Sequence, residues 1–400
     1  MATSGSRSVR RAAYGLVASA VLLASGACSA GSTPGTSDAP APGPTPTAAT
    51  VAAEGTTPCT VELPQGWGAA LDEGVVAPRA GETLTVALGL ADRSVFAVSD
   101  VPGVRHALVW RHLGAADATA DRVVADLGLD HPEWQVLGAT FDGRYLAYRV
   151  DRSYSGFEDF GLYVWDSQGD AAPVEVAHGE PDAQGQLMQT PFVDPVLADG
   201  WLYWTQTRDA DPGRTVLSGY RLADGHVERL SRGFGRAPVR FGAWLVWADS
   251  DAAGQTSGLR AIDLATHAPV DLPAPLAGVR GPYYLAADAG TLAWVGGEQG
   301  RQVWVWRDGW PAARLLADGA QAPQFPRVAG DTVVWTGEDA TWVGDLRSFS
   351  DARLTPSYGG VWADGGPVVA VGYAPADKGQ DSVQALLDTD AAGPLGRAGC

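Results

Sequence analysis

Short apolar runs separated by turn residues recur along the chain from about residue 84. The most regular run recurs seven times, as Ser94–Val98, Tyr145–Tyr148, Trp201–Trp204, Trp244–Trp247, Thr291–Trp294, Thr332–Trp335 and Pro367–Val371. Most of these runs follow a turn such as Phe141–Gly143, and Asp-Gly between two apolar runs is the strongest short hairpin signal. The pattern therefore predicts seven similar units built from short strands.

Two further strands follow most of these runs. The next strands in the units are Gly161–Asp166, Val216–Leu222, Gly258–Leu264, Gln302–Trp306 and Thr341–Leu346. The short strands after them are Val174–Val176, Val227–Leu230, Val270–Leu272, Ala313–Leu316 and Ala352–Leu354. A period of roughly 40–50 residues with four strands per unit is typical of a β-propeller. We therefore expect an all-β fold, a seven-bladed β-propeller, over residues 59–400.

Runs such as Trp201–Trp204 and Trp244–Trp247 are apolar at every position. A strand with one wet face alternates apolar and polar residues, so these strands need cover on both faces. A two-layer sandwich leaves one face of each sheet in water, whereas each propeller blade lies between two neighbouring blades. The pattern thus favours the propeller over the sandwich.

The recurring Asp-Gly turns, the Leu-x-Trp strands and elements such as Leu259–Leu264 resemble the TolB-like and WD40-like propellers of bacterial cell-envelope proteins. The resemblance covers about residues 59–400 and implies the fold, but that fold hosts many activities. Only Trp165–Asp166 matches the dipeptide of true WD40 repeats, and the N-terminal α/β domain of TolB itself is lacking. A Tol-system role is therefore not implied.

Residues 1–27 have the layout of a secretory signal peptide. Arg7, Arg10 and Arg11 precede an uncharged apolar run, residues 12–27, which is shorter than the ~20 residues of a membrane-spanning helix. The run ends in Ala24–Cys28, which resembles the lipobox of bacterial lipoproteins, although Ser25 stands where Leu is usual. The resemblance implies lipidation of Cys28; ordinary signal cleavage is the alternative.

Residues 28–58 form a linker of Pro, Ala, Ser, Thr and Gly that lacks the apolar bulk needed to fold. Behind a lipidated Cys28 this linker would act as an extended tether. The predicted order is a signal peptide (1–27), the lipidated cysteine with its linker (28–58) and the propeller (59–400). The protein is expected at the outer face of the cell membrane, or secreted if Cys28 carries no lipid.

The formal net charge is −18. Loss of residues 1–27 removes three arginines and no acidic residue, which leaves 25 basic against 46 acidic residues, or −21. Such a surface repels nucleic-acid phosphates and anionic lipid headgroups. We expect no nucleic-acid partner, membrane contact through the lipid anchor only, and a monomer.

Two cysteines, Cys59 and Cys400, remain after Cys28 and stand at the two ends of the folded part. A propeller closes when a strand from one end completes a blade built by the other, and Cys59–Leu63 is expected to be that N-terminal strand in the last blade. A Cys59–Cys400 disulfide would lock this closure, as is usual for an even pair in an exported protein. Unpaired thiols or a bridge between molecules are the alternatives.

Repeated tryptophans and acidic loops are the two features that could carry chemistry. Trp204, Trp247, Trp294 and Trp335 are expected to pack between blades rather than to line a sugar-binding channel. Acidic residues in the loops between the first two of these strands are expected to form a solvated rim rather than a cation or basic-partner site. They are Asp151, Glu158, Asp159, Asp209, Asp211, Asp249, Asp251, Glu298, Glu338, Asp339, Asp377 and Asp381.

The sequence contains no motif that identifies catalytic, cofactor-binding or metal-binding residues, and none is assigned. The six histidines lack metal-ligand spacing, and Asp249–Gly254 departs from a calcium loop at Ala253 and Arg260. The first hypothesis is a cell-envelope binding or scaffold propeller for a protein, peptide or glycan. The alternative is an extracellular glycan hydrolase or lyase that uses carboxylates of the acidic face, which predicts paired carboxylates at the central channel.

Overall fold

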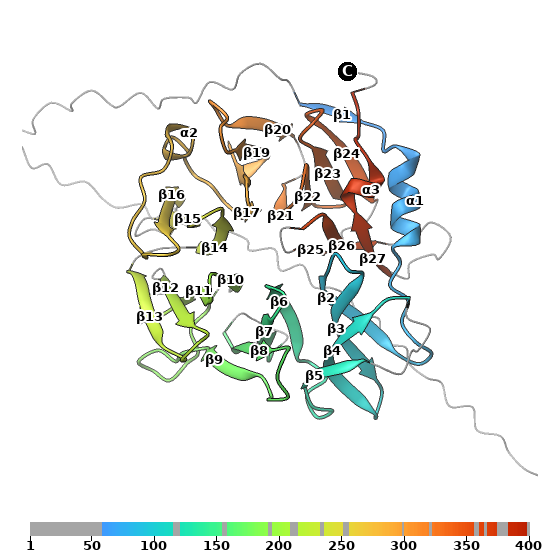
Figure 1. The fold of residues 1–400 in the computed structure, drawn as a ribbon, viewed down its shortest axis with the longest axis vertical. Coiled ribbons are helices and arrows are strands. Elements are labelled where there is room, and N and C mark those ends of the chain that lie inside the picture. Colours follow the sequence, from blue (N-terminus) through green and yellow to red (C-terminus); the bar gives the residue numbers. More distant parts are fainter. Residues whose placement is uncertain are drawn as a thin grey trace, which may run out of the picture. The chain divides into compact units, whose positions relative to one another are not determined.

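The described residues form seven sheets arranged around a common centre (Figure 1). The computed structural model describes residues 58–114, 121–153, 158–190, 194–208, 215–232, 236–250, 256–297, 300–319, 322–355, 360–363, 366–373 and 383–397. All of them belong to one compact unit, residues 49–400. The predicted signal peptide, Cys28 and nearly all of the linker lie outside the described residues and stay predictions.

The first three blades each contain four strands. Blade 1 consists of β2 (Thr83–Gly89), β3 (Ser94–Val101), β4 (Arg105–His112) and β5 (Arg122–Asp126). Blade 2 consists of β6 (Gln135–Phe141), β7 (Tyr145–Asp151), β8 (Phe160–Asp166) and β9 (Val174–His178). Blade 3 consists of β10 (Val196–Ala198), β11 (Trp201–Thr207), β12 (Thr215–Arg221) and β13 (Val227–Arg232).

The remaining four blades vary more at their outer edges. Blade 4 consists of β14 (Arg236–Phe241), β15 (Trp244–Ser250) and β16 (Thr256–Asp263), with helix α2 (Ala274–Ala277) after it. Blade 5 consists of β17 (Leu285–Ala287), β18 (Thr291–Gly296), β19 (Gln302–Arg307) and β20 (Arg314–Asp318). Blade 6 contains β21 (Gln324–Ala329), β22 (Thr332–Thr336), β23 (Thr341–Asp345) and β24 (Ser350–Thr355). Blade 7 contains β25 (Val361–Trp362), β26 (Val368–Tyr373) and β27 (Val383–Asp388), with helix α3 (Thr389–Ala392) after it.

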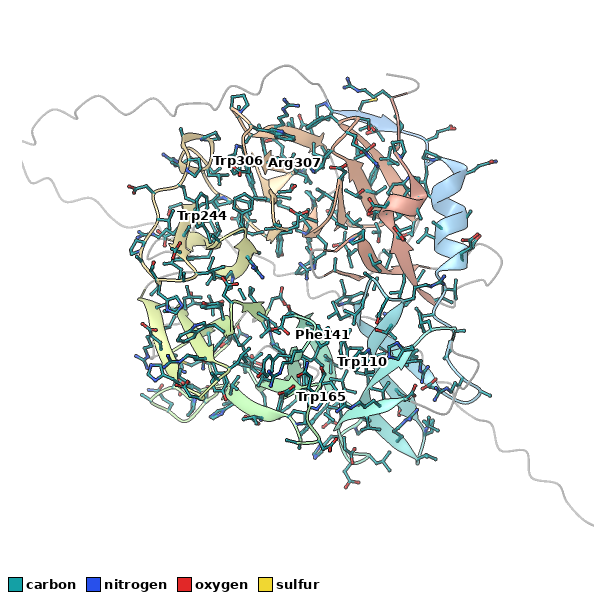
Figure 2. All side chains as sticks on the ribbon, in the orientation of Figure 1. Trp110, Phe141, Trp165, Trp244, Trp306 and Arg307 are labelled. Atoms are coloured by element: carbon teal, nitrogen blue, oxygen red, sulfur yellow. The ribbon has the colours of Figure 1, made fainter. Side chains whose placement is uncertain are left out.

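The seven predicted units are therefore confirmed as seven blades. The recurring apolar run is the second strand of each blade, and in β11 the residues Leu202, Tyr203 and Trp204 are fully buried. Aromatic rings also pack between neighbouring blades. Trp110 of blade 1 lies 5.7 Å from Phe141 and 6.3 Å from Trp165 of blade 2, between ring centroids (Figure 2).

The innermost strand of each blade was not predicted from the sequence. These strands, β2, β6, β10, β14, β17, β21 and β25, lie directly before the predicted turns and pair antiparallel with the second strands. In the turn after β6, one Asp142 carboxylate oxygen accepts hydrogen bonds from the backbone N–H groups of Arg144 (2.9 Å) and Tyr145 (2.7 Å), and Gly143 has a φ of 97°. Turns rich in Asp and Gly thus join several of the channel-facing strands to the rest of their blades.

The prediction that Cys59–Leu63 completes the last blade is wrong. Strand β1 (Cys59–Val61) pairs in parallel with β24 and adds a fifth strand to blade 6. Residues 74–76 complete blade 7 instead, because the Val76 N–H donates to the Gln384 carbonyl (2.8 Å) and the Leu386 N–H donates to the Gly74 carbonyl (2.8 Å). A β-carbon at position 74 would overlap the Leu386 carbonyl, so only glycine permits this pairing.

Helix α1 (Gln65–Glu73) connects these two attachments and spans blades 6 and 7 (Figure 1). Trp67 is fully buried and packs in one cluster with Val343 of blade 6 and Leu387 of blade 7. We call residues 59–76 the N-terminal strap. It contacts two adjacent blades before the chain enters blade 1, so closure involves more than one added strand.

The C-terminal segment returns to blade 6. The Leu395 N–H donates to an Asp345 carboxylate oxygen (3.0 Å), and the Ser350 hydroxyl donates to the Gly396 carbonyl (2.7 Å). Ser350 is also the register partner of Cys59. Both ends of the described chain therefore meet at β24, while Cys400 lies outside the described residues and the predicted disulfide stays a prediction.

Candidate functional site

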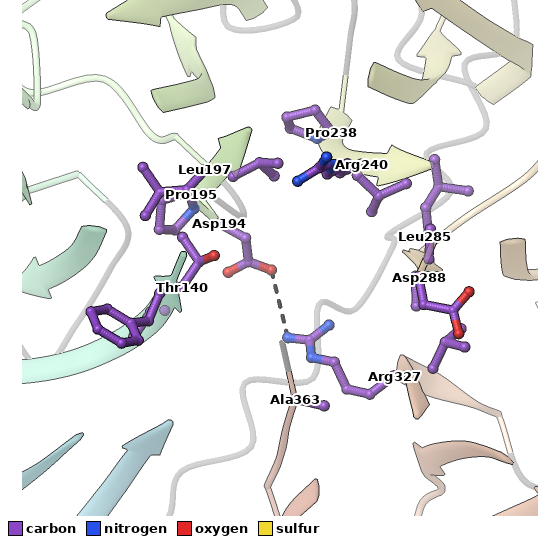
Figure 3. Close-up of a pocket in the computed structure, with 18 of the residues that line it drawn as sticks. Thr140, Asp194, Pro195, Leu197, Pro238, Arg240, Leu285, Asp288, Arg327 and Ala363 are labelled. Atoms are coloured by element: carbon purple, nitrogen blue, oxygen red, sulfur yellow. Dashed lines mark ion pairs between the residues drawn. The ribbon is translucent and has the colours of Figure 1, made fainter. Parts of the chain in front are cut away.

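A cavity of about 600 Å³ lies where the innermost strands converge (Figure 3). Six of the seven blades, blades 2 to 7, contribute lining residues from these strands or the turns that follow them. Most lining side chains are apolar, among them Pro195, Val196, Leu197, Pro238, Val239, Leu285, Val328 and Trp362. The polar lining consists of Thr140, Asp142, Asp194, Arg240, Asp288 and Arg327.

β-Bulges distort three of the strands that line this cavity. The pairing register shifts between Val136 and Gly138 in β6, between Arg236 and Val239 in β14, and between Gln324 and Arg327 in β21. Bulges redirect side chains and are common next to functional sites. In β21 the bulge contains Phe325, whose φ of 48° is a strained value for an aromatic residue. The distortion ends immediately before Arg327, which enters the cavity.

An ion pair crosses the cavity between Asp194 and Arg327. Asp194 lies just before β10 in blade 3 and Arg327 lies on β21 in blade 6, so the pair connects blades that are three positions apart in a ring of seven (Figure 3). An Arg327 Nη2 atom is 3.7 Å from an Asp194 carboxylate oxygen. Arg327 also donates from Nη1 to the Pro326 carbonyl (3.1 Å). This pair places one cation and one anion inside the cavity.

A second arginine, Arg240, lines the cavity from β14. Its guanidinium is 3.3 Å from an Asp199 carboxylate oxygen of blade 3, and both side chains are about half exposed (50% and 48%). Its Nε also donates to the Gly242 carbonyl at 3.4 Å. Arg240 therefore adds positive charge at the solvent-exposed part of the lining.

The other two lining carboxylates serve the fold. Asp142 caps the turn after β6, as described above, and Asp288 caps the turn after β17 by accepting from the N–H groups of Gly290 (2.9 Å) and Thr291 (2.7 Å). Such side-chain-to-backbone bonds occupy the carboxylates as turn formers. The three carboxylates of the described lining are thus two turn caps and the arginine-paired Asp194.

Asp151 at the end of β7 is a further carboxylate whose charge is coupled to that of Asp194. It is buried (4% exposed), and its carboxylate is 2.5 Å from Arg149 Nε. Burial raises its pKa, Arg149 opposes that shift, and the charges of Asp159 and Asp194 raise the pKa further. Asp151 is thus a buried, arginine-paired carboxylate that is not among the described lining residues.

The predicted acidic rim is largely paired where the structure describes it. Arg260 is 2.8 Å from Asp249, Arg353 is 3.5 Å from Asp339, and Gln189 donates to Glu158 (3.0 Å). Asp209, Asp211, Asp251, Glu298, Asp377 and Asp381 lie outside the described residues. Within the described ranges, no group of three or more His, Cys, Asp or Glu could hold a metal ion.

The repeated tryptophans pack between blades, as predicted. Trp204, Trp247, Trp294 and Trp335 are all less than 5% exposed, and each belongs to a hydrophobic cluster. None of the four is among the residues that line the cavity described above. Their role is therefore to fill the space between blades.

Two other polar clusters lie away from the cavity lining. In blade 1, Arg111 pairs with both Glu82 (2.6 Å) and Asp121 (2.8 Å). Burial opposes ionisation of Glu82, but hydrogen bonds from Arg111 and Ser99 outweigh it and lower the Glu82 pKa to about 2. Between blades 3 and 4, His267 bonds the buried Tyr203 hydroxyl at 3.0 Å. Both clusters stabilise the blades, because their central groups are buried and already paired.

Comparison with known proteins identifies the class but not a family. No protein-family model matches the sequence, and no curated protein matches it. A solved prolyl endopeptidase is similar over 82% of this chain at 15% identity with a TM-score of 0.54, and the chain spans about half of that protein (50%). At this identity the likeness shows the fold alone. The chain is a seven-bladed β-propeller with a mixed apolar and charged central cavity.

Two TolB structures are also among the similar structures. A putative TolB from Agrobacterium tumefaciens has 14% identity and a TM-score of 0.39, over 67% of this chain and 93% of that protein. TolB from Acinetobacter baumannii has 11% identity and a TM-score of 0.37, over 78% of this chain and 65% of that protein. Likenesses at this level carry no argument about function.

The sequence prediction missed the charged cavity residues Asp194, Arg240 and Arg327. One signal was present: Pro195, Pro238 and Pro326 stand at equivalent places, a few residues before the turns at 199–200, 242–243 and 330–331. Proline is confined to edge strands and bulges because it cannot donate to the ladder. A proline at the same place before three of the turns therefore marks an unpaired strand edge, here the edge that faces the channel.

Proposed function

We propose that this chain is a binding propeller of the cell envelope that holds a peptide, or a short segment of a partner protein, in its central cavity. The cavity itself carries the proposal. It combines apolar walls with a few convergent polar groups, the usual composition of ligand sites, and its volume of about 600 Å³ falls in the usual range for such sites.

A peptide fits this cavity better than a glycan. Sugar rings are usually recognised by stacking on exposed aromatic side chains, and the described lining contains only Phe141 and Trp362 as aromatic residues. Phe141 already packs against Phe96 at 5.2 Å and Trp110 at 5.7 Å between ring centroids. Trp362 is partly buried and packs against the cluster that contains Val368 and Ala370. The rest of the lining is mainly aliphatic, proline and charged side chains, and these match the side chains and polar ends of a peptide.

Cross-linking from the cavity tests this function. Ala289 is an exposed lining residue. A photoreactive amino acid at this position should give a discrete adduct of higher mass when the protein is cross-linked in the cells that naturally produce it. The matched control places it at Val104, which is 72% exposed on blade 1 and does not line the cavity. Mass spectrometry of the adduct should find peptide. Absence of an adduct from Ala289, or the same adducts from both positions, contradicts the proposal.

We also propose that the chain is exported and held at the membrane by a lipid on Cys28. The basic and apolar segment before Cys28 and the linker after it support this location. Among the described residues, no helix is long and apolar enough to span a membrane.

The Cys28→Ala variant should move from the membrane fraction to the culture medium, because one lipid-bearing residue supplies the whole attachment. Immunoblots of the membrane fraction and the medium measure this shift, with Ser32→Ala in the linker as the control that keeps Cys28. Equal membrane retention of the Cys28→Ala variant would refute the lipid anchor and leave the cavity proposal untouched.

A further inference from the structure

The ion pair across the cavity is loosely held. The Arg327 Nη2 to Asp194 Oδ2 distance of 3.7 Å exceeds a hydrogen-bond distance, and the two side chains are 23% and 41% exposed. Exposed pairs of this kind contribute little to stability. The pair can therefore open without unfolding the blades, and it connects two strands that have no other described ion pair with each other.

Opening the pair presents opposite charges on opposite sides of the cavity. Asp194 remains on the blade 3 side, just before β10, and Arg327 remains on β21 behind its bulge. Apolar residues such as Pro195, Pro238 and Leu285 line other parts of the same cavity (Figure 3). The open cavity thus has an anion and a cation within a largely apolar lining.

We propose that the Asp194–Arg327 pair opens to bind a short peptide whose two termini are free, with the peptide carboxylate on Arg327 and its ammonium group on Asp194. The inference rests on the proposed function and names the ligand class. Each protein charge exchanges one partner for another, so no charge stays unpaired in the cavity.

Ligands of one charge sign fit less well. An anion would leave Asp194 without its partner and would also meet the lining carboxylates Asp142 and Asp288. A cation would leave Arg327 unpaired, since its other described contact is a bond to the Pro326 carbonyl. A zwitterion with a short apolar body satisfies both ends at once.

The bulge in β21 supports this role by fixing Arg327. Phe325 holds its strained backbone while its ring packs 4.7 Å from the ring of Tyr284 in the neighbouring blade. Strain of this kind persists only where the surrounding structure imposes it. The Arg327 backbone is therefore positioned before any ligand arrives, which reduces the ordering cost of binding.

Isothermal titration calorimetry with the tripeptide Ala-Leu-Ala tests the proposal. Four forms are compared: free termini, acetylated amino terminus, amidated carboxyl terminus and both ends blocked. Loss of a charge-assisted interaction costs about tenfold in affinity. The free form should bind about tenfold more tightly than either singly blocked form and more tightly still than the doubly blocked form.

Two variants separate the two charges. Arg327→Gln should remove the preference for a free carboxylate and keep the preference for a free amino group, and Asp194→Asn should do the reverse. Arg353→Gln should match the wild type, because it removes an exposed arginine on β24 that is 3.5 Å from Asp339 and away from the cavity. A merely structural role of the pair would weaken all four peptides equally.

Equal affinity for all four peptide forms, or no binding of any, overturns the zwitterion proposal. A persisting adduct from Ala289 in the same protein would then show that only the ligand class was wrong. Loss of both the adduct and the peptide binding would contradict the proposed function as well.

Discussion

Truncation of Trp67 to alanine is expected to lower the free energy of unfolding by about 3–5 kcal/mol, the usual cost of deleting a buried tryptophan side chain. Trp67 is fully buried in the cluster that joins the N-terminal strap to blades 6 and 7. Its removal leaves a cavity where the strap packs against blades 6 and 7. Denaturant titration followed by circular dichroism measures the change.

The position of Trp67 explains why the loss should affect the whole ring. The residues on either side of α1 pair with different blades, since β1 extends β24 and residues 74–76 extend β27. Loosening α1 therefore weakens both attachments together. Gln65→Ala is the matched control, because Gln65 lies on the same helix and is exposed. A loss below about 1 kcal/mol for Trp67→Ala would show that the helix is peripheral to stability.

Apolar periodicity predicted the part of the fold that is buried on both faces. The second strands, such as Trp201–Thr207, are apolar throughout because two neighbouring blades cover them, and their turns carry Asp and Gly. The number of blades and their order along the chain follow directly from that repeat. These features depend on residues close together in the sequence, so they can be predicted from one sequence.

The innermost strands could not be recognised in the same way. β10, β17 and β25 contain only two or three residues, and β6, β14 and β21 are interrupted by bulges. Neither kind shows a run of alternating or continuous apolar residues long enough to predict a strand. The cavity lies on these strands, so Asp194, Arg240 and Arg327 were missed together with them.

The closure was mispredicted because the pairing partner is distant in sequence. Cys59–Val61 and residues 74–76 are both short enough to pair with any open edge, and only the packing of Trp67 and Leu71 decides which edge each one meets. That packing depends on contacts with residues near 343 and 387. Local sequence contains no information about such contacts.

The corrected closure changes the geometry of the predicted disulfide but supports it. Cys59 is paired with Ser350, and Ser350 bonds to Gly396, so residue 396 lies close to Cys59. The four residues from Gly396 to Cys400 can extend about 13–14 Å. Cys59 is itself buried (5% exposed) at the start of β1. A bridge would therefore fix the strap and the C-terminal segment to the same edge of blade 6.

The Cys400→Ser variant should lose on the order of 5 kcal/mol of stability relative to the oxidised wild type, because the bridge closes a loop of several hundred residues. Cys400 is the better position to change, since Cys59 is buried and its replacement would also disturb packing. Denaturant titration of both proteins, with and without reductant, measures the effect. The reduced wild type should have the same stability as the variant, and reductant should not change the stability of the variant.

The bridge is contradicted if both Cys59 and Cys400 of unfolded, unreduced wild type react with a thiol reagent. A disulfide survives unfolding, whereas free thiols become accessible to the reagent.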